Sequence, residues 1–387
     1  MEKFRIAIPD ADLDDLRGRL AATRWPDEGH SPGWERGVPQ EYLRDLADYW
    51  QHEYDWRAAE AELNRFPQYT TEIDGARVHF LHVRSPEPGA TPLLITHGWP
   101  SSFVEFSQII EPLTNPRAHG GQASDAYHLV IPTIPGFGFS SPVRTPGWSI
   151  PRVAGAWAQL MAQLGYERYV THGGDLGAWI NHVLAAIDAE HVVGSHVSFL
   201  ITPPGPDPAD LAGLTEVEMG RLGLLARFAG DLSGYMKLQS TRPQTVGYGL
   251  TDSPIAQLAW IVEKFHDWTD SVKAPEDAVD RDQMLTNVMV YWLTRTGMSS
   301  AHFYYDSADM MPTAPTPPAP PPPLPVPSGV SVFPRDPAQP IRRFADRMLP
   351  NIVQWTEHER GGHFPAMEVP DLLVADLRAF AQALTGS

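Results

Sequence analysis

Residues 170–180, VTHGGDLGAWI, decide how this sequence folds. The apolar residues at the start predict a strand, the glycines predict a tight turn, and the apolar residues after them predict a helix. A strained strand-to-helix turn can present a nucleophile, and it leaves no room for flanking side chains. Asp175 lies at the nucleophile position, between Gly173 and Gly177. Because Asp also N-caps helices, this motif alone leaves both interpretations open.

A carboxylate at this position restricts the chemistry. Its attack on an amide would give an anhydride that reverts, whereas its attack on an sp³ carbon gives an ester. Epoxides and alkyl halides offer such a carbon. Hydrolysis of the ester then needs a general base for water and N–H donors for the carbonyl oxygen.

Two residues near the C-terminus are candidates for the base and its partner. His363 lies in a glycine-flanked loop before the last predicted helix, and Asp336 follows the apolar run at 330–333. The chain order nucleophile, acid, histidine fits a strand-to-helix nucleophile. The sequence holds 15 His, so position rather than residue type singles out His363. A structural His, and an Asp that caps a helix over 341–348, remain the alternatives.

The two half-reactions each develop an oxyanion that needs a donor, the alkoxide in ring opening and the carbonyl oxygen in ester hydrolysis. The backbone N–H groups of Leu176 and Trp99 are the candidate oxyanion hole for the ester. A Tyr phenol can protonate the alkoxide; the candidates are Tyr235 in GYMKLQSTRPQT and Tyr304, with Tyr305 beside it as the alternative. We expect no cofactor and no metal, since HExxH is absent and His363 and Glu368 lie on a proline-containing loop with poor ligand geometry.

The pattern of apolar and polar residues along the chain predicts four segments. Residues 1–90 form an N-terminal meander of three amphipathic helices and a hairpin at Asp74-Gly75. Strands and helices then alternate over 91–200, which predicts a mainly parallel sheet. Residues 201–309 read as an inserted helical cap, and 310–387 resume the core. A stiff proline-rich linker is expected at 312–329.

Composition excludes several classes of partner. The net charge of −18 argues against nucleic acid and anionic membranes. Cysteine is absent, which excludes disulfides, cysteine nucleophiles and cysteine-ligated metals, and fits a cytoplasmic protein. No signal peptide or membrane anchor is expected from the N-terminal residues. A homodimer is left open.

Taken together, the sequence resembles the microsomal-type epoxide hydrolases over nearly the whole chain. The segments that carry the resemblance are FRIAIPDADLDDLRGRLAATRWPD (4–27), HGWPSSFVEF (97–106), PTIPGFGFSSP (132–142), HGGDLGAW (172–179), GYMKLQSTRPQT (234–245), LTDSPIAQLAWIVEKFHDW (250–268), LTNVMVYWLT (285–294), GVSVFPRD (329–336) and RGGHFPAMEVPDLL (360–373). The resemblance implies an α/β-hydrolase fold with a helical cap and an N-terminal meander.

For the reaction, the resemblance implies that an apolar epoxide becomes a vicinal diol. Asp175 is then the nucleophile, His363 the base with Asp336 as its acid partner, and Tyr235 and Tyr304 the ring-opening acids. Unlike the membrane-anchored relatives, this chain does not begin with an apolar helix, and its proline tract is unusually long.

The candidate residues also bear on three other functions. Haloalkane dehalogenases share the Asp and His but typically carry Trp after the nucleophile, where this chain has Leu176. A non-catalytic protein that binds small apolar ligands would need none of the five candidate side chains. A serine esterase is disfavoured because no GxSxG motif lies at the right place. Cap aromatics such as Trp260, Phe265 and Trp268 suggest an apolar pocket, although core packing explains them equally well.

Overall fold

The computed structural model describes residues 1–27, 33–205, 207–311 and 323–386. Its centre is a nine-stranded sheet with the order β1-β2-β3-β5-β4-β6-β7-β8-β9. Neighbouring strands from β5 to β9 run parallel, and β1, β2 and β3 join one edge antiparallel. The strands are β1 (Glu2–Phe4), β2 (Gln68–Ile73), β3 (Ala76–Val83), β4 (Thr91–Thr96), β5 (Tyr127–Pro132), β6 (Tyr169–Gly173), β7 (Val192–Val197), β8 (Ser328–Val332) and β9 (Ile352–Glu357).

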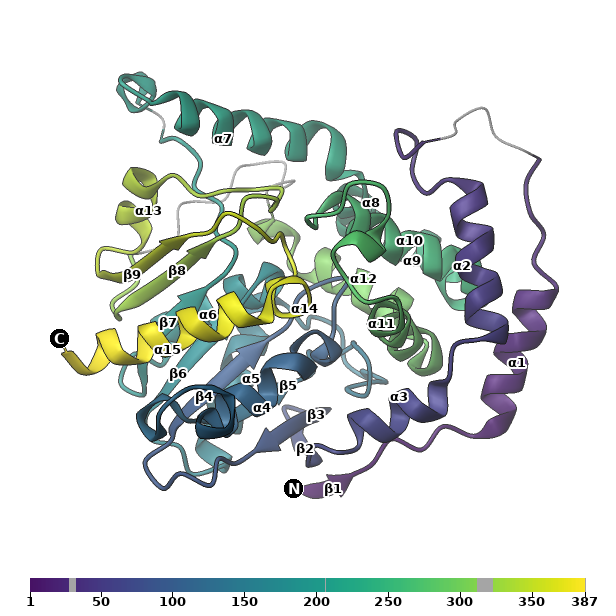
Figure 1. Ribbon diagram of the computed structural model, residues 1–387, viewed down its shortest axis with the longest axis horizontal. Helices are drawn as coiled ribbons and strands as arrows, with labels where there is room; N and C mark the ends of the chain where they lie inside the picture. Colours follow the sequence, from purple (N-terminus) through teal and green to yellow (C-terminus); the bar gives the residue numbers. More distant parts are fainter. Residues whose placement is uncertain (28–32, 206, 312–322, 387) are drawn as a thin grey trace.

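Helices cover both faces of this sheet (Figure 1). α5 (Ile150–Gln163) and α6 (Asp175–Ile187) pack on each other on one face, and α4 (Ser107–Thr114) and α15 (Pro370–Gly386) do so on the other. The central strands are therefore buried on both sides, which is why β4 reads as an apolar run and not as an alternating pattern. The expected α/β-hydrolase fold with a mostly parallel sheet is confirmed.

The cap consists of helices, as expected for 201–309. Its elements are α7 (Glu216–Arg227), a π-helical turn (Phe228–Leu232), α8 (Gly234–Thr241), α9 (Pro243–Asp252), α10 (Pro254–Asp267), α11 (Arg281–Thr294) and α12 (Gly297–Asp306). The cap lies over the carboxyl ends of the central strands. Two bonds attach α11 there, from Asn287 Nδ2 to the Pro100 carbonyl (2.7 Å) and from Tyr291 Oη to the Ser101 carbonyl (2.7 Å).

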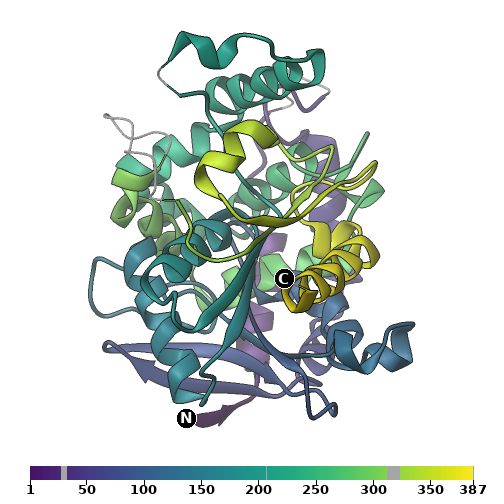
Figure 2. The ribbon, with the colours of Figure 1, turned by 90° about the vertical axis from the view of Figure 1, so that its left-hand side faces the viewer.

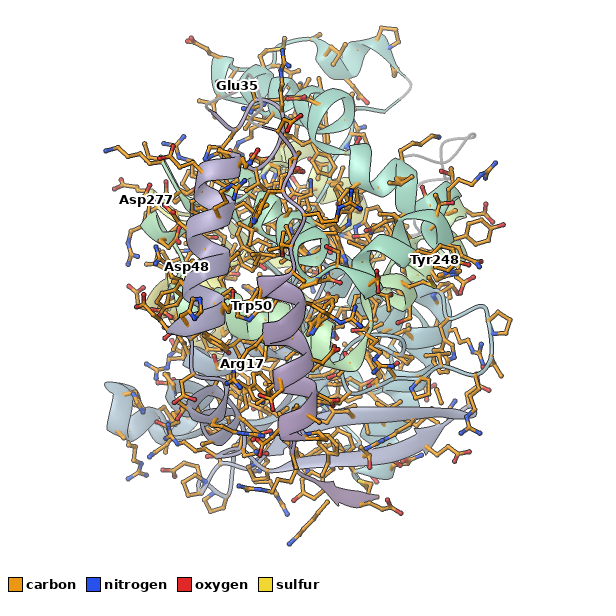
Figure 3. The ribbon with its side chains drawn as sticks, turned by 90° about the vertical axis from the view of Figure 1, so that its right-hand side faces the viewer. Arg17, Glu35, Asp48, Trp50, Tyr248 and Asp277 are labelled. Carbon is orange, nitrogen blue, oxygen red and sulfur yellow. The ribbon has the colours of Figure 1, made fainter. Side chains whose placement is uncertain are left out.

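The N-terminal helices pack against the cap (Figure 3). They are α1 (Asp10–Ala21), α2 (Gln40–His52) and α3 (Trp56–Leu63), and α1 and α2 both contact α10. Trp50 of α2 is buried, and its indole N–H donates to Met289 Sδ of α11 at 3.2 Å. The hairpin turn also forms as expected, because Asp74 and Gly75 both adopt positive φ between β2 and β3.

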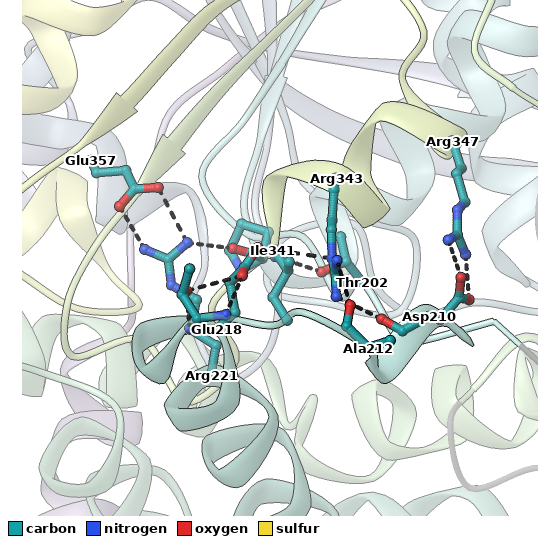
Figure 4. A network of polar contacts seen from close by, with 11 residues as sticks. Thr202, Asp210, Ala212, Glu218, Arg221, Ile341, Arg343, Arg347 and Glu357 are labelled. Carbon is teal, nitrogen blue, oxygen red and sulfur yellow. Dashed lines mark hydrogen bonds and ion pairs between the residues drawn. The ribbon is translucent and has the colours of Figure 1, made fainter. Parts of the chain in front are cut away.

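α7 differs from the rest of the cap because polar contacts hold it in place (Figure 4). It lies at the top of the molecule in Figure 1 and Figure 2, and Arg221 is its only buried residue. Arg221 pairs with Glu357 of β9, at 2.6 Å. In the segment before α7, Asp210 offers its carbonyl to Arg343 and its carboxylate to Arg347, both on α13 (Arg342–Met348).

Two boundaries differ from what the sequence pattern predicts. The pattern predicts a strand over 192–199, which ends at Val197, and a helix over 178–187, which begins at Asp175. β1 and β9 were not predicted. β9 is a partly exposed edge strand of mixed polarity, so it lacks the apolar run that marks the central strands. The expected linker lies outside the described residues at 312–322, and Ser328 and Gly329 at its end already belong to β8.

Candidate active site

Asp175 occupies a strained turn between β6 and α6. Its φ of 47° is left-handed, which is rare for any residue but glycine. The flanking glycines are sterically required, since a Cβ on Gly177 would lie 2.0 Å from the Thr96 carbonyl oxygen, and one on Gly173 would lie 2.5 Å from the backbone of Gly177. The helix-cap interpretation of Asp175 is wrong, because Gly174 is the N-cap of α6 and no side chain caps it.

The Asp175 carboxylate instead faces the loop after β4. Trp99 N–H donates to Asp175 Oδ1 at 2.9 Å, and its role as an oxyanion donor stays a prediction. Gly98 permits the approach, because a Cβ there would lie 2.4 Å from both Cβ and Oδ1 of Asp175. The Leu176 N–H, the second expected donor, remains a prediction.

The other carboxylate oxygen of Asp175 faces His363. His363 Nε2 lies 3.4 Å from Asp175 Oδ2, and His363 Nδ1 lies 3.3 Å from Asp336 Oδ1. Both His363 and Asp336 are buried. Asp336 is not the N-cap of α13, which is Ile341. Residues widely separated in sequence thus form one chain of charges, in the order Asp175, His363, Asp336.

This position sets the charge of the imidazole. Burial by itself lowers the pKa of His363, but Asp336 and Asp175 more than offset burial and raise that pKa to about 10. Burial also raises the pKa of Asp336, and the His363 imidazolium opposes that rise. A protonated imidazole between two carboxylates is therefore the resting state that the geometry favours at neutral pH.

Two Tyr side chains from the cap complete the site. Tyr235 of α8 stacks on the Trp99 ring with centroids 4.7 Å apart, and Tyr304 of α12 meets both rings edge-on, at 5.9 Å each. Burial, reinforced by Asp175, raises the pKa of both phenols well above 10, so both stay protonated. The Tyr304 hydroxyl interacts with that of Tyr235, so the two phenols form a buried pair beside the nucleophile. Tyr305 is 55% exposed and points away from the site.

A small apolar cavity of about 20 Å³ adjoins Asp175 and Tyr304. That volume holds little more than one water molecule. Sequence reasoning missed its walls, because they come from separate segments; they are Leu176, Trp179, Phe199, Ile201, Phe228, Met236 and Met311. The three aromatics singled out earlier do not line this cavity, although Trp268 contacts the rings of His363 and Tyr235. Phe265 and Trp268 pack against the ring of Phe364, and Trp260 hydrogen-bonds to Gln239.

Comparison with known proteins places this geometry in a family. Residues 1–106 match the model described as epoxide hydrolase N terminus, and residues 93–377 match the alpha/beta hydrolase family. A protein of Stigmatella aurantiaca named putative epoxide hydrolase is 46% identical over 375 residues, which cover 97% of this chain and 83% of that protein. This chain belongs to the epoxide hydrolase family.

More distant epoxide hydrolases agree over the full length. Epoxide hydrolase 1 of Oryctolagus cuniculus is 33% identical over 97% of this chain and 88% of its own. The structure of the Aspergillus niger epoxide hydrolase matches with a TM-score of 0.86 at 32% identity, covering 99% of this chain and 96% of that one. The Bombyx mori juvenile hormone epoxide hydrolase matches with a TM-score of 0.88 at 28% identity, covering 100% and 95%. Within the described residues, no helix is both long and apolar enough to cross a membrane.

Proposed function

We propose that this enzyme opens an apolar epoxide through a covalent ester on Asp175. The observation that carries the proposal is the pair of buried Tyr hydroxyls, since Tyr304 adjoins the same cavity as the nucleophile and interacts with Tyr235. Both phenols stay protonated, so an epoxide oxygen in that cavity would accept a hydrogen bond from them. A binding protein or a dehalogenase has no need for such a donor.

In the first half-reaction, Asp175 Oδ2 attacks a ring carbon and the carbon–oxygen bond of the epoxide breaks. Tyr235 or Tyr304 gives its proton to the departing alkoxide. The resulting tyrosinate then takes a proton from the His363 imidazolium. The products are a hydroxyalkyl ester on Asp175, a neutral imidazole and two neutral phenols, so charge and protons balance.

In the second half-reaction, the ester removes the negative charge of Asp175, one of the two causes that raise the pKa of His363. The neutral imidazole can then take a proton from water, and the hydroxide attacks the ester carbonyl carbon. Asp175 Oδ1 becomes the oxyanion and is stabilised by the Trp99 N–H and, as we expect, by that of Leu176. Collapse expels the alkoxide, which takes a proton from the His363 imidazolium and becomes the vicinal diol. The carboxylic acid of Asp175 then gives its proton to His363, which restores the carboxylate and the imidazolium beside Asp336.

The apolar cavity supports an apolar substrate, and its size implies movement on binding. An epoxide is larger than the one water that fits, so some of the walls must give way. Met236 and Met311 are suited to this, since Met side chains adapt their shape at low cost. We also propose that the chain consists of four units, which are the N-terminal meander (1–90), the first part of the core (91–200), the helical cap (201–309) and the second part of the core (310–387).

The test uses a variant that can form the ester but not hydrolyse it. His363→Gln, mixed with styrene oxide, should gain the mass of one epoxide on the peptide that contains Asp175. The wild type should release diol by trans opening, and Asp175→Asn should do neither. An unmodified His363→Gln protein, or halide release from haloalkanes without diol from epoxides, would overturn the proposal.

A further inference from the structure

One buried carboxylate beside the site has no role in the reaction so far. Glu368 lies at the end of α14 (Pro365–Glu368), five residues after His363. Its Oε1 accepts a hydrogen bond from Phe364 N–H at 2.9 Å, and its Oε2 accepts one from Asp270 N–H at 2.8 Å. The first bond is local and would occur at many helix ends. The second reaches the cap, in the turn that follows α10.

The same cap turn touches the loop of His363 at other points. The His363 N–H donates to the Trp268 carbonyl at 2.7 Å. The Gly361 N–H donates to Asp270 Oδ2 at 3.1 Å. The contact is tight, because a Cβ on Gly362 would lie 2.5 Å from the Trp268 carbonyl oxygen. The loop of the base is therefore fastened along its backbone to the cap.

Asp270 extends this attachment to the loop of the acid. Its Oδ1 pairs with Arg335 Nε at 3.1 Å, next to Asp336 in sequence, and the Arg335 N–H donates to the Gly361 carbonyl at 3.1 Å. Asp270 and Glu368 together thus join the His363 loop, the Asp336 loop and the cap. We call this pair of carboxylates, with the N–H groups they accept, the clasp.

Side chains of the same turn set the position of the imidazole. The Trp268 ring meets the His363 ring edge-on with centroids 5.0 Å apart, and it also contacts Tyr235 at 5.3 Å. The Phe364 ring stacks on the Trp268 ring with centroids 6.3 Å apart and meets the His363 ring edge-on at 5.0 Å. His363 and Tyr235 are therefore both positioned against the same cap turn. Glu368 accepts one hydrogen bond from that turn and one from the His363 loop, so it links the two backbones.

We propose that Glu368 is a positioning residue for His363. Its carboxylate fixes the backbone beside the imidazole to the cap, so that Nε2 stays in line with the ester on Asp175 when the cap moves to admit substrate. This role rests on the ester mechanism proposed above. Burial raises the pKa of Glu368 to about 7 against the effect of the two N–H donors, which is the cost of holding a carboxylate at this place.

Removing the clasp should slow ester hydrolysis, in which His363 activates the water, and spare ester formation, in which His363 gives up its proton only after the ester has formed. In Glu368→Ala, single-turnover formation of the Asp175 ester should stay within about threefold of wild type. Hydrolysis of the ester should fall about 10- to 100-fold, since an error of about 1 Å in placing a reacting group can cost that much. The ester then accumulates, and kcat and KM fall together. A loss of folding would instead lower the amount of ester formed and leave the two rate constants unchanged.

Conservative variants separate positioning from packing. Glu368→Gln keeps the shape and one acceptor, but turns an amide N–H₂ toward the second donor, so its hydrolysis rate should lie between those of Glu368→Ala and wild type. Asp371→Asn is the matched control, because Asp371 is an exposed carboxylate three residues further on that pairs with Arg360 of the same loop. Its two rates should match wild type within twofold.

If Glu368→Ala does not fold, Asp270→Asn tests the clasp from the cap side, and it should slow hydrolysis selectively. Equal slowing of ester formation and hydrolysis, or hydrolysis at the wild-type rate in these variants, would overturn the proposal. Failure of the ester mechanism itself is distinguishable: the wild type would then form no adduct on Asp175 during a turnover. An adduct in the wild type with normal hydrolysis in the Glu368 variants would contradict the positioning role of Glu368 and leave the ester mechanism standing.

Discussion

At the scale of the residue, the site depends on where a few hydrogen atoms lie. Asp175 keeps one oxygen on the Trp99 N–H and turns the other toward His363. The hydroxyls of Tyr304 and Tyr235 interact with each other and stay protonated. In the proposed reaction, these hydroxyls act in ring opening and the Trp99 N–H acts in hydrolysis of the ester. Substitutions that remove a single proton donor should therefore affect one step of the reaction and leave the fold intact.

The adjacent tyrosines give a matched pair. Tyr304→Phe should slow ester formation about 100-fold or more, because general acid catalysis typically contributes that much. Tyr305→Phe, at an exposed position on the same helix, should stay within twofold of wild type. Rapid-quench measurement of the Asp175 adduct gives both rates. Comparable losses in the two variants would contradict the assignment of Tyr304.

The raised pKa of His363 predicts how stability depends on pH. The pKa is about 10 in the folded protein and 6.5 in the unfolded chain, so the folded state binds more protons between these values. The stabilisation is complete below about pH 6.5 and is lost as the pH rises to about 10. The Tm of the wild type should fall more steeply from pH 7 to 10 than that of His363→Gln. Parallel slopes in the two proteins would mean that His363 is neutral at rest.

At the scale of the element, the sequence predicts what local patterns specify. The turn at Asp175 was predictable because its glycines are required at fixed offsets. The place of Asp336 after a strand was predictable because β8 pairs with β7 whatever the length of the proline tract before it. The cavity walls and the Glu368 to Asp270 bond were not, since they join segments that only tertiary packing brings together. In the sequence, Glu368 stands out only as a possible metal ligand of poor geometry.

α7 offers a test of an element held by charge. Arg221→Met removes the ion pair between the buried Arg221 and the half-exposed Glu357, so amide exchange in α7 should quicken about tenfold, for a loss of about 1–2 kcal/mol. Arg342→Met is the control, because Arg342 pairs with Asp346 within its own exposed helix. Hydrogen exchange read by mass spectrometry compares the two. Unchanged exchange of α7 in Arg221→Met would show that other contacts hold the helix.

At the scale of the whole molecule, the N-terminal helices and the cap form one packed body over the sheet. A single apolar core includes Leu13 of α1, Trp50 of α2 and Met289 of α11. We therefore expect the N-terminal segment to support the cap that carries Tyr235 and Tyr304. Its contribution to activity is indirect, through the position of those cap helices.

Trp50→Ala tests this dependence. Loss of a buried Trp typically costs about 3–5 kcal/mol, and here it also removes a contact to the cap. Thermal unfolding of the variant should begin earlier, and activity should fall in step with it. The control is Tyr248→Ala, which removes an exposed aromatic of the same face and should change stability by about 0.5 kcal/mol or less (Figure 3). An early transition in Trp50→Ala that leaves activity unchanged would mean that the N-terminal segment unfolds independently of the site.

The fate of one oxygen atom tests the ester mechanism most directly. Enzyme in molar excess over epoxide completes one turnover in ¹⁸O-water, and the diol and the peptide containing Asp175 are then weighed. An ester attacked by water at its carbonyl carbon gives an unlabelled diol and one ¹⁸O in the Asp175 carboxylate. A labelled diol with an unlabelled Asp175 would mean that water attacks the epoxide directly, and would contradict the role of Asp175 as nucleophile.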